Sequence, residues 1–142
     1  MILPIVGYGD PVLRKEGIEI AKDYPNLQEL IENMFQTMEN ASGVGLAAPQ
    51  IGLAIRLFVI DCSPFGEDED LSEEERNTLK TLRKTFINAK ITKEEGEEWA
   101  FNEGCLSIPN VREDVMRKPI ITIEYFNEKF EKITEVYNGF AA

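Results

Sequence analysis

The chain has 142 residues, which suits one domain with its own core, and 43% of them are hydrophobic, which favours a folded globule over disorder. Its formal net charge of −11 disfavours direct binding to nucleic acid, because phosphate groups would be repelled. The sequence has no apolar run near the roughly 20 residues that span a bilayer, no signal-peptide pattern and no disulfide framework, so a cytoplasmic protein without a membrane partner is expected.

The first half of the chain is predicted to hold one long amphipathic helix. An extended start with a turn at Gly9–Asp10–Pro11 precedes it. Apolar side chains then recur at helical spacing between Leu27 and Ala41. Asn26 is the expected N-cap, and Ser42–Gly43 is the expected end.

The rest of the chain is predicted to be mainly strands. They are expected over 55–61, 85–91, 98–109, 119–126 and 129–137, and the last two form a hairpin with its turn at Asn127–Glu128. The acidic run over 65–76 is expected to be solvated, with a short helix begun by a capping box of Ser72 and Glu75, and 92–98 is expected to be a charged turn. A helix followed by strands, without repeats or linkers, predicts a single α+β domain over 1–142.

Cys105, in the stretch EGCLS (103–107), is the first candidate for chemistry. The chain contains no histidine, so a cysteine nucleophile with a histidine base is excluded. A metal site needs roughly three protein ligands, and nothing in the sequence places partners beside Cys105. From the residues alone, both a buried thiol and a metal ligand remain open.

The stretch GVGLAAPQ (43–50) is the second candidate. Its glycines would let another backbone approach closely, and the Gln50 amide could donate to a carbonyl oxygen. It is not a phosphate loop, because it follows a helix and carries no lysine. A tight connection between helix and strand, packed with small side chains, explains the same residues and remains open.

Together, GVGLAAPQ and EGCLS resemble the first two signature motifs of the peptide deformylases. The VLR near the start, the helix before the first motif, IRLFVID after it and the INAKI strand agree with that family, so the resemblance covers essentially the whole chain. It implies an α+β fold with mixed, mainly antiparallel sheets around a helix. It also implies a metal-dependent hydrolase that removes the N-formyl group from nascent peptides beginning with formyl-methionine, using Fe²⁺ in many members and Zn²⁺ or Ni²⁺ in others.

The resemblance also implies roles for individual residues. Cys105 would be a metal ligand, and Gln50 with the backbone N–H of Leu106 would bind the formyl oxygen as its charge grows. The peptide would lie as an added strand along a track formed by Gly43, Val44, Gly45, Leu46, Gly104 and Arg112.

One departure from the family limits this interpretation. The family's third motif, His-Glu-x-x-His on a C-terminal helix, is absent, and the sequence ends at Ala142 just before its expected place. The chain is therefore expected to be C-terminally truncated, catalytically incompetent, unable to hold the metal stably, and prone to self-association through an exposed core. Two alternatives stay open: a short homologue that binds formylated peptides or a protein partner without catalysis, and a fragment that finds its missing helix in another chain.

Overall fold

The computed structural model describes residues 2–7, 9–64, 69, 72–105 and 108–138, with the backbone alone for 100–105, 108–115 and 138. Its helical elements are η1 (Pro11–Arg14), α1 (Leu27–Asn40), η2 (Ala48–Ile51) and α2 (Glu73–Lys80). Its strands are β1 (Gly45–Ala47), β2 (Leu57–Asp61), β3 (Arg83–Glu95), β4 (Trp99–Cys105), β5 (Ile108–Arg117), β6 (Ile120–Phe126) and β7 (Lys132–Asn138).

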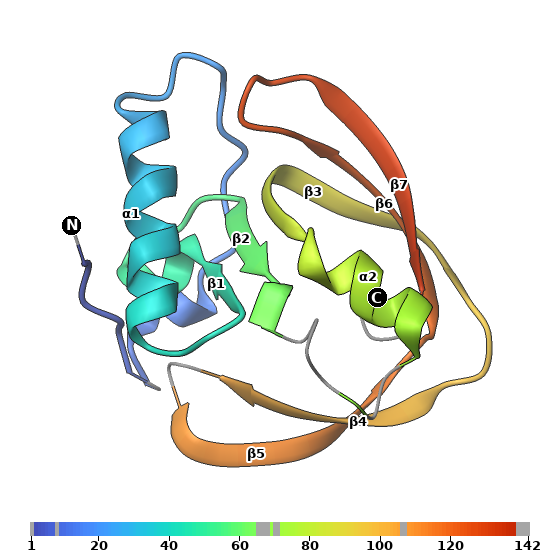
Figure 1. Cartoon of the computed structure of the whole chain (residues 1–142). Coiled ribbons are helices and arrows are strands. Elements are labelled where there is room, and N and C mark those ends of the chain that lie inside the picture. Colours follow the sequence, from blue (N-terminus) through green and yellow to red (C-terminus); the bar gives the residue numbers. More distant parts are fainter. Residues whose placement is uncertain (1, 8, 65–68, 70–71, 106–107, 139–142) are drawn as a thin grey trace.

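The strands form two antiparallel sheets. The main sheet has the order β1-β2-β3-β6-β7, and β4 pairs with β5 in a separate hairpin. Figure 1 shows α1 beside β1 and β2, with β6 and β7 beyond β3 and the β4–β5 hairpin along the bottom of the view. A parallel bridge between Ile18 and Ile55 ties the segment before α1 to the residues just before β2. This arrangement confirms the α+β prediction.

Helix α1 forms where the periodicity predicts it, but its ends differ in detail. Asn26 has φ 55°, and its side chain makes no capping hydrogen bond. At the other end, Gly43 N–H donates to Met38 O at 2.9 Å and Ser42 N–H donates to Glu39 O at 3.1 Å, which is a Schellman motif. The left-handed residue of this motif is Ser42, with φ 57°, rather than the glycine.

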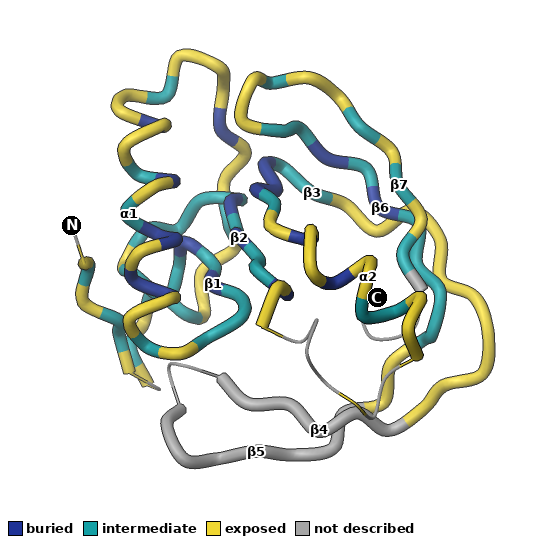
Figure 2. Tube along the Cα trace, viewed as in Figure 1, coloured by how far each residue is buried: buried dark blue, intermediate teal, exposed yellow. Residues whose placement is uncertain are grey.

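The main sheet separates two apolar clusters, because successive strand residues point to opposite faces. On one face, Leu57 and Val59 of β2 pack with the buried side of α1. On the other face, Phe58 stacks on Phe86 with ring centroids 4.8 Å apart, and Tyr125 covers the far side of Phe86. Figure 2 shows the buried positions concentrated where α1 meets β1, β2 and the start of β3. The fold's main core therefore lies directly behind β1.

Two strand predictions were wrong in extent. The segment 92–98 was expected to be a turn, yet β3 continues through Glu95, and the turn lies at Gly96 with φ 91°. The strand expected over 98–109 ends at Cys105 as β4, and 108–117 forms a separate strand, β5, of which only the first two residues lay within the expected strand. The end of β3 pairs with β6 but is exposed, so its charged residues carry no alternating apolar signal.

Two local predictions on the same half of the chain fit better. Ser72 Oγ accepts a hydrogen bond from Glu75 N–H at 3.1 Å and begins α2. Asn127 Oδ1 accepts hydrogen bonds from Lys129 N–H at 2.9 Å and Glu131 N–H at 3.0 Å, which shapes the β6–β7 turn. Within the described part of the chain, no helix has the length and apolarity that crossing a membrane requires.

A polar cluster joins the three strands β3, β6 and β7. Lys84 Nζ lies 2.9 and 2.7 Å from the two oxygens of Glu135, Tyr137 OH donates to Glu135 at 3.1 Å, and Tyr125 OH donates to Glu135 as well. Partial burial opposes ionisation of Glu135, but the hydrogen bonds from Lys84, Tyr125 and Tyr137, with the charge of Lys84, leave the pKa of its carboxyl below the ordinary value of 4.5. The charged carboxylate therefore stabilises the fold.

Replacing this carboxylate should expose its contribution to stability. Because the pKa of Glu135 is lowered on folding, its stabilisation is complete above the ordinary value of 4.5 and is lost as the pH falls through the lower folded value. Glu135→Gln should reduce the unfolding free energy at neutral pH by about 1–3 kcal/mol and flatten its pH dependence in the acid range. Chemical denaturation at several pH values measures both effects.

Glu124→Gln is the matched control, because Glu124 pairs with Lys132 on the same hairpin at 2.9 Å but with 40% of its side chain exposed. It should cost well under about 1 kcal/mol. Equal losses in the two variants would contradict the role assigned to the cluster.

Candidate functional site

Strand β1 is an edge strand whose outer side is open in the described structure. It pairs with β2 alone, with Gly45 opposite Ile60, Leu46 opposite Val59 and Ala47 opposite Phe58. Just before it, Asp61 N–H donates to Val44 O at 2.9 Å, so the opposed residues Val44 and Asp61 form a hydrogen-bonded pair.

The phase of this ladder sets the direction of every backbone group in β1. Hydrogen-bonded and non-bonded pairs alternate in antiparallel strands, so Leu46 turns its N–H and C=O toward β2. Gly45 and Ala47 must then turn theirs outward, away from the sheet. An extended chain laid along β1 would therefore meet the N–H and C=O of Gly45.

The packing of this chain does not require a glycine at position 45. A Cβ built there would lie 3.7 Å from Val59 O and 3.8 Å from the Ile60 side chain, which are ordinary contacts. Gly45 is also absent from the described glycines with positive φ. Neither backbone conformation nor crowding from the described residues therefore accounts for the glycine at this position.

Gln50 sits in η2 immediately after β1. Its Oε1 accepts the outward N–H of Ala47 at 3.0 Å, and its backbone oxygen accepts Val6 N–H at 2.8 Å. Gly52, with φ 89°, then lets the chain turn back toward β2. The amide of Gln50 is thus held at the end of the open edge, with its oxygen directed at β1 and its nitrogen on the other side.

Not every residue of the predicted peptide track has its side chain at the surface. Leu46 has 2% of its surface exposed and belongs to the core behind the sheet, so only its backbone lies along β1. Gly43 and Val44 lie on the connection from α1, where Gly43 completes the helix cap. The stretch from the end of α1 through β1 to η2 therefore carries Gly43, Val44, Gly45 and Gln50 next to one another along the open edge.

The second motif lies at the end of the β4–β5 hairpin. Gly104 is opposite Arg112 and Cys105 is opposite Ile108, with a register shift between the two pairs. For Gly104, Cys105 and Arg112 the backbone alone is described, and Leu106 lies outside the described residues. The register places Arg112 directly across from the motif glycine.

A metal site is not formed by the part of the chain that the structure describes. No group of three or more histidine, cysteine, aspartate and glutamate side chains gathers there. The other cysteine, Cys62, is buried beside Leu79 and Leu82, and burial together with the charge of Asp61 raises the pKa of its thiol to about 11. Cys62 is therefore protonated at neutral pH and poorly suited to bind a metal.

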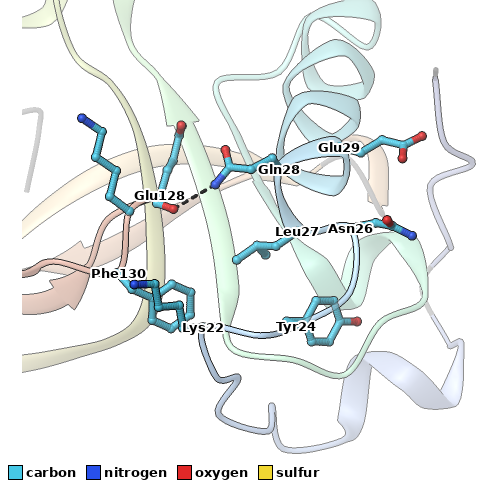
Figure 3. Close-up of a pocket in the computed structure, with 9 residues that line it drawn as sticks. Lys22, Tyr24, Asn26, Leu27, Gln28, Glu29, Glu128 and Phe130 are labelled. Carbon is cyan, nitrogen blue, oxygen red and sulfur yellow. Dashed lines mark hydrogen bonds between the residues drawn. The ribbon is translucent and has the colours of Figure 1, made fainter.

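Figure 3 shows a groove at the other end of α1, under the β6–β7 turn. Gln28 Nε2 donates to Glu128 O at 2.9 Å across it, and Tyr24, Leu27 and Phe130 form its apolar part. The groove is lined by two lysines and two glutamates, so it has no net preference for an anion or a cation. None of the residues that the sequence suggests for catalysis, peptide binding or metal binding lines it.

The sequence did not single out Asp61, although its N–H sets the phase of the β1 ladder. The pattern IRLFVID predicts a strand there, but the alternation of apolar residues carries no information about which neighbour pairs with it. An acidic residue at a strand end is too common a signal to have identified it.

The comparisons with known proteins agree with one another. The family model described as polypeptide deformylase matches residues 2–142. A peptide deformylase of Flavobacterium johnsoniae is 68% identical over 142 residues, which are all of this chain and 72% of that protein. The structure of a peptide deformylase from Thermotoga maritima has a TM-score of 0.83 at 34% identity and covers 100% of this chain and 85% of that one. One from Synechococcus elongatus, in complex with actinonin, has a TM-score of 0.82 at 34% identity, covering 99% and 68%.

Adding a methyl group at position 45 should not harm the fold. Gly45→Ala has room for its Cβ, and it removes the entropic cost of a glycine in a strand. The unfolding free energy should stay equal or rise by up to about 1 kcal/mol in chemical denaturation. Gly52→Ala is the control, because its φ of 89° strains any other residue, and it should lose about 1 kcal/mol. A clear loss in Gly45→Ala would show that the fold itself needs this glycine.

Proposed function

The chain belongs to the polypeptide deformylase family, and we propose that its 142 residues supply the peptide track and the formyl-oxygen donors of a deformylase acting on formyl-methionyl nascent peptides in the cytoplasm. The observation that carries this proposal is the open edge of β1, with Gly45 turned outward and Gln50 held at its end.

The peptide would bind as an added strand along β1. Its backbone would exchange hydrogen bonds with the outward N–H and C=O of Gly45, while Gly43 and Val44 extend the path toward α1. Leu46 would take part through its backbone position alone, because its side chain fills the core. In this proposal Gly104 and Arg112, opposite each other in the β4–β5 hairpin, flank the same peptide.

Gln50 would donate from its amide nitrogen to the formyl oxygen. Support comes from the bond between Ala47 N–H and Gln50 Oε1 at 3.0 Å, because an amide whose oxygen is engaged at the strand has its orientation set before the substrate binds. A donor prepared in this way stabilises developing negative charge without reorganising. The N–H of Leu106 would be the second donor.

The family's members are metalloenzymes, but the donor set of this chain does not fit a complete metal site. Cys105 would supply one thiolate, and the 142 residues contain no histidine. One ligand is too few for a stable site, so the remaining ligands and the base that moves protons would have to come from outside these residues. No step through the metal is therefore assigned to residues of this chain.

A second candidate function is binding of formylated peptides, or of a protein partner, without catalysis. The observation that favours it is the same open edge in a chain that lacks histidine. On the sheet face opposite α1, Phe58 and Ile60 are only partly buried and Ile91 is 50% exposed. That face is where we propose that copies of the chain, or a helix from another chain, would associate.

The two candidate functions are distinguished by comparing the 142-residue chain with a chain extended past Ala142. The 142-residue chain should hold no equimolar metal after dialysis against a chelator and should not deformylate a formyl-methionyl peptide, because ligands and base are lacking. Adding a family C-terminal helix with His-Glu-x-x-His after Ala142 should restore both properties, since histidines four apart share one helix face. Metal analysis and a deformylation assay measure this.

The control for this experiment is the extended chain with Cys105→Ser, which should bind the metal more weakly. An extended chain that folds but binds no metal would contradict the assignment of Cys105. Turnover by the 142-residue chain itself, abolished by a chelator, would contradict the proposed need for outside ligands.

In the extended chain, Gln50→Ala should keep the metal and slow deformylation by about 10²–10³-fold, as expected for loss of one oxyanion donor. Gln28→Ala is the matched control, because this exposed glutamine bonds Glu128 O at the far end of α1. It should leave the rate unchanged. If the two variants deformylate at the same rate, the role proposed for Gln50 is wrong.

A further inference from the structure

Arg83, the first residue of β3, touches two elements at once. Its guanidinium carbon lies 3.7 Å from the ring centroid of Phe35 in α1, and Nη2 lies 3.6 Å from Glu39 Oε1 in the last turn of that helix. Its Nε lies 3.6 Å from Asp61 Oδ2 at the end of β2, the residue opposite Arg83 in the ladder. Arg83 therefore connects the end of α1 to the end of β2.

These two ends define where β1 starts. From the helix side, Gly43 N–H is held by Met38 O at 2.9 Å. From the sheet side, Val44 O is held by Asp61 N–H, also at 2.9 Å. Gly43 and Val44 are adjacent in the chain, so a change in the distance between the end of α1 and the end of β2 would strain or break one of these two hydrogen bonds. The phase of the β1 ladder, and with it the outward direction of Gly45, depends on the second of these bonds.

The contacts of Arg83 can fix the distance between the end of α1 and the end of β2. Ion pairs at 3.6 Å on a side chain that is 51% exposed contribute little by themselves. The face of the guanidinium, however, covers Phe35, which is buried, and this contact is less sensitive to solvent. Asp61 is 13% exposed and also accepts Ser63 N–H at 3.0 Å and Ser63 Oγ at 2.6 Å, so it is a fixed partner.

We propose that Arg83 is a positioning residue that holds the start of β1 in the arrangement that accepts a peptide. The peptide part rests on the proposed function, whereas the effect on β1 does not. A planar guanidinium can stack on Phe35 and face two carboxylates together, which an ammonium group cannot do. Arg83→Lys should therefore recover only part of what Arg83→Met loses.

The experiment uses the 142-residue chain and two measurements. Amide hydrogen exchange by NMR follows Gly43 and Asp61, whose N–H groups hold the connection, and titration with formyl-Met-Ala-Ser gives the dissociation constant. Arg83→Met should speed both exchange rates about threefold to tenfold and weaken peptide binding by a similar factor, with Arg83→Lys in between. Lys84→Met is the control at the neighbouring position, because it also removes a positive charge from β3 but breaks the pair with Glu135 at 2.7 Å instead.

Lys84→Met should leave the exchange of Gly43 and Asp61 and the peptide affinity within about twofold of the wild type. If Arg83→Met and Lys84→Met speed the two amides equally, Arg83 has only a general structural role and the proposal is overturned. It is overturned equally if exchange rises while peptide affinity stays the same. A wild-type chain that binds no formylated peptide would overturn the proposed function, and the exchange rates would then decide the role of Arg83 in holding β1.

Discussion

The hydrogen bond from Asp61 N–H to Val44 O determines the phase of the β1–β2 ladder. Antiparallel pairs alternate, so one such bond dictates which backbone groups of β1 point into the sheet and which point out. A shift by one residue would turn Leu46 away from the core and direct Gly45 at β2. The burial of Leu46 at 2% makes that shift costly. The core behind β1 and the open edge in front of it are therefore two consequences of one register.

The residues after β1 make use of the same register. Ala47 is the next outward position, and its N–H is taken by Gln50 Oε1 rather than left for a ligand. The open edge consequently has the N–H and C=O of Gly45 directed outward and ends at the side-chain amide of Gln50. Gly52 returns the chain toward β2 and keeps η2 short. In such an arrangement a peptide would be positioned by backbone groups and a formyl oxygen by one side chain.

Much of this fold could be predicted from the sequence because its strongest signals are periodic. Helix α1, strand β2 and the β6–β7 hairpin carry apolar repeats and turn residues that local chemistry explains. The exposed end of β3 was missed because its charged residues carry no such repeat, and most of β5 was missed because the charged residues in VREDVMR interrupt any apolar repeat in the sequence. The left-handed Ser42 was missed because glycine is the usual residue there, and Gly43 stands next to it.

The candidate site was predictable as a set of residues but not as a geometry. The two motifs named Gly45 and Gln50, yet the sequence holds no information on the ladder phase that turns Gly45 outward, nor on Asp61 and Arg83, which lie outside both motifs. Contacts between segments that are far apart in the chain depend on packing, which one sequence does not display. Leu46 illustrates the difference, because it lies in the motif but its side chain belongs to the core.

Peptide recognition and metal chemistry make different demands on a sequence. The open edge of β1 consists of backbone groups, so it needs a register and a core but few particular side chains. The likeness to the Thermotoga maritima structure, with a TM-score of 0.83 at 34% identity, shows how far the fold tolerates changes of residue. Metal binding, by contrast, needs particular side chains at particular positions, and a single thiolate supplies only one of the three or four ligands that a stable site requires. Under the proposed function, peptide recognition would follow from the fold of this chain, whereas metal binding would need histidine ligands that its sequence does not contain.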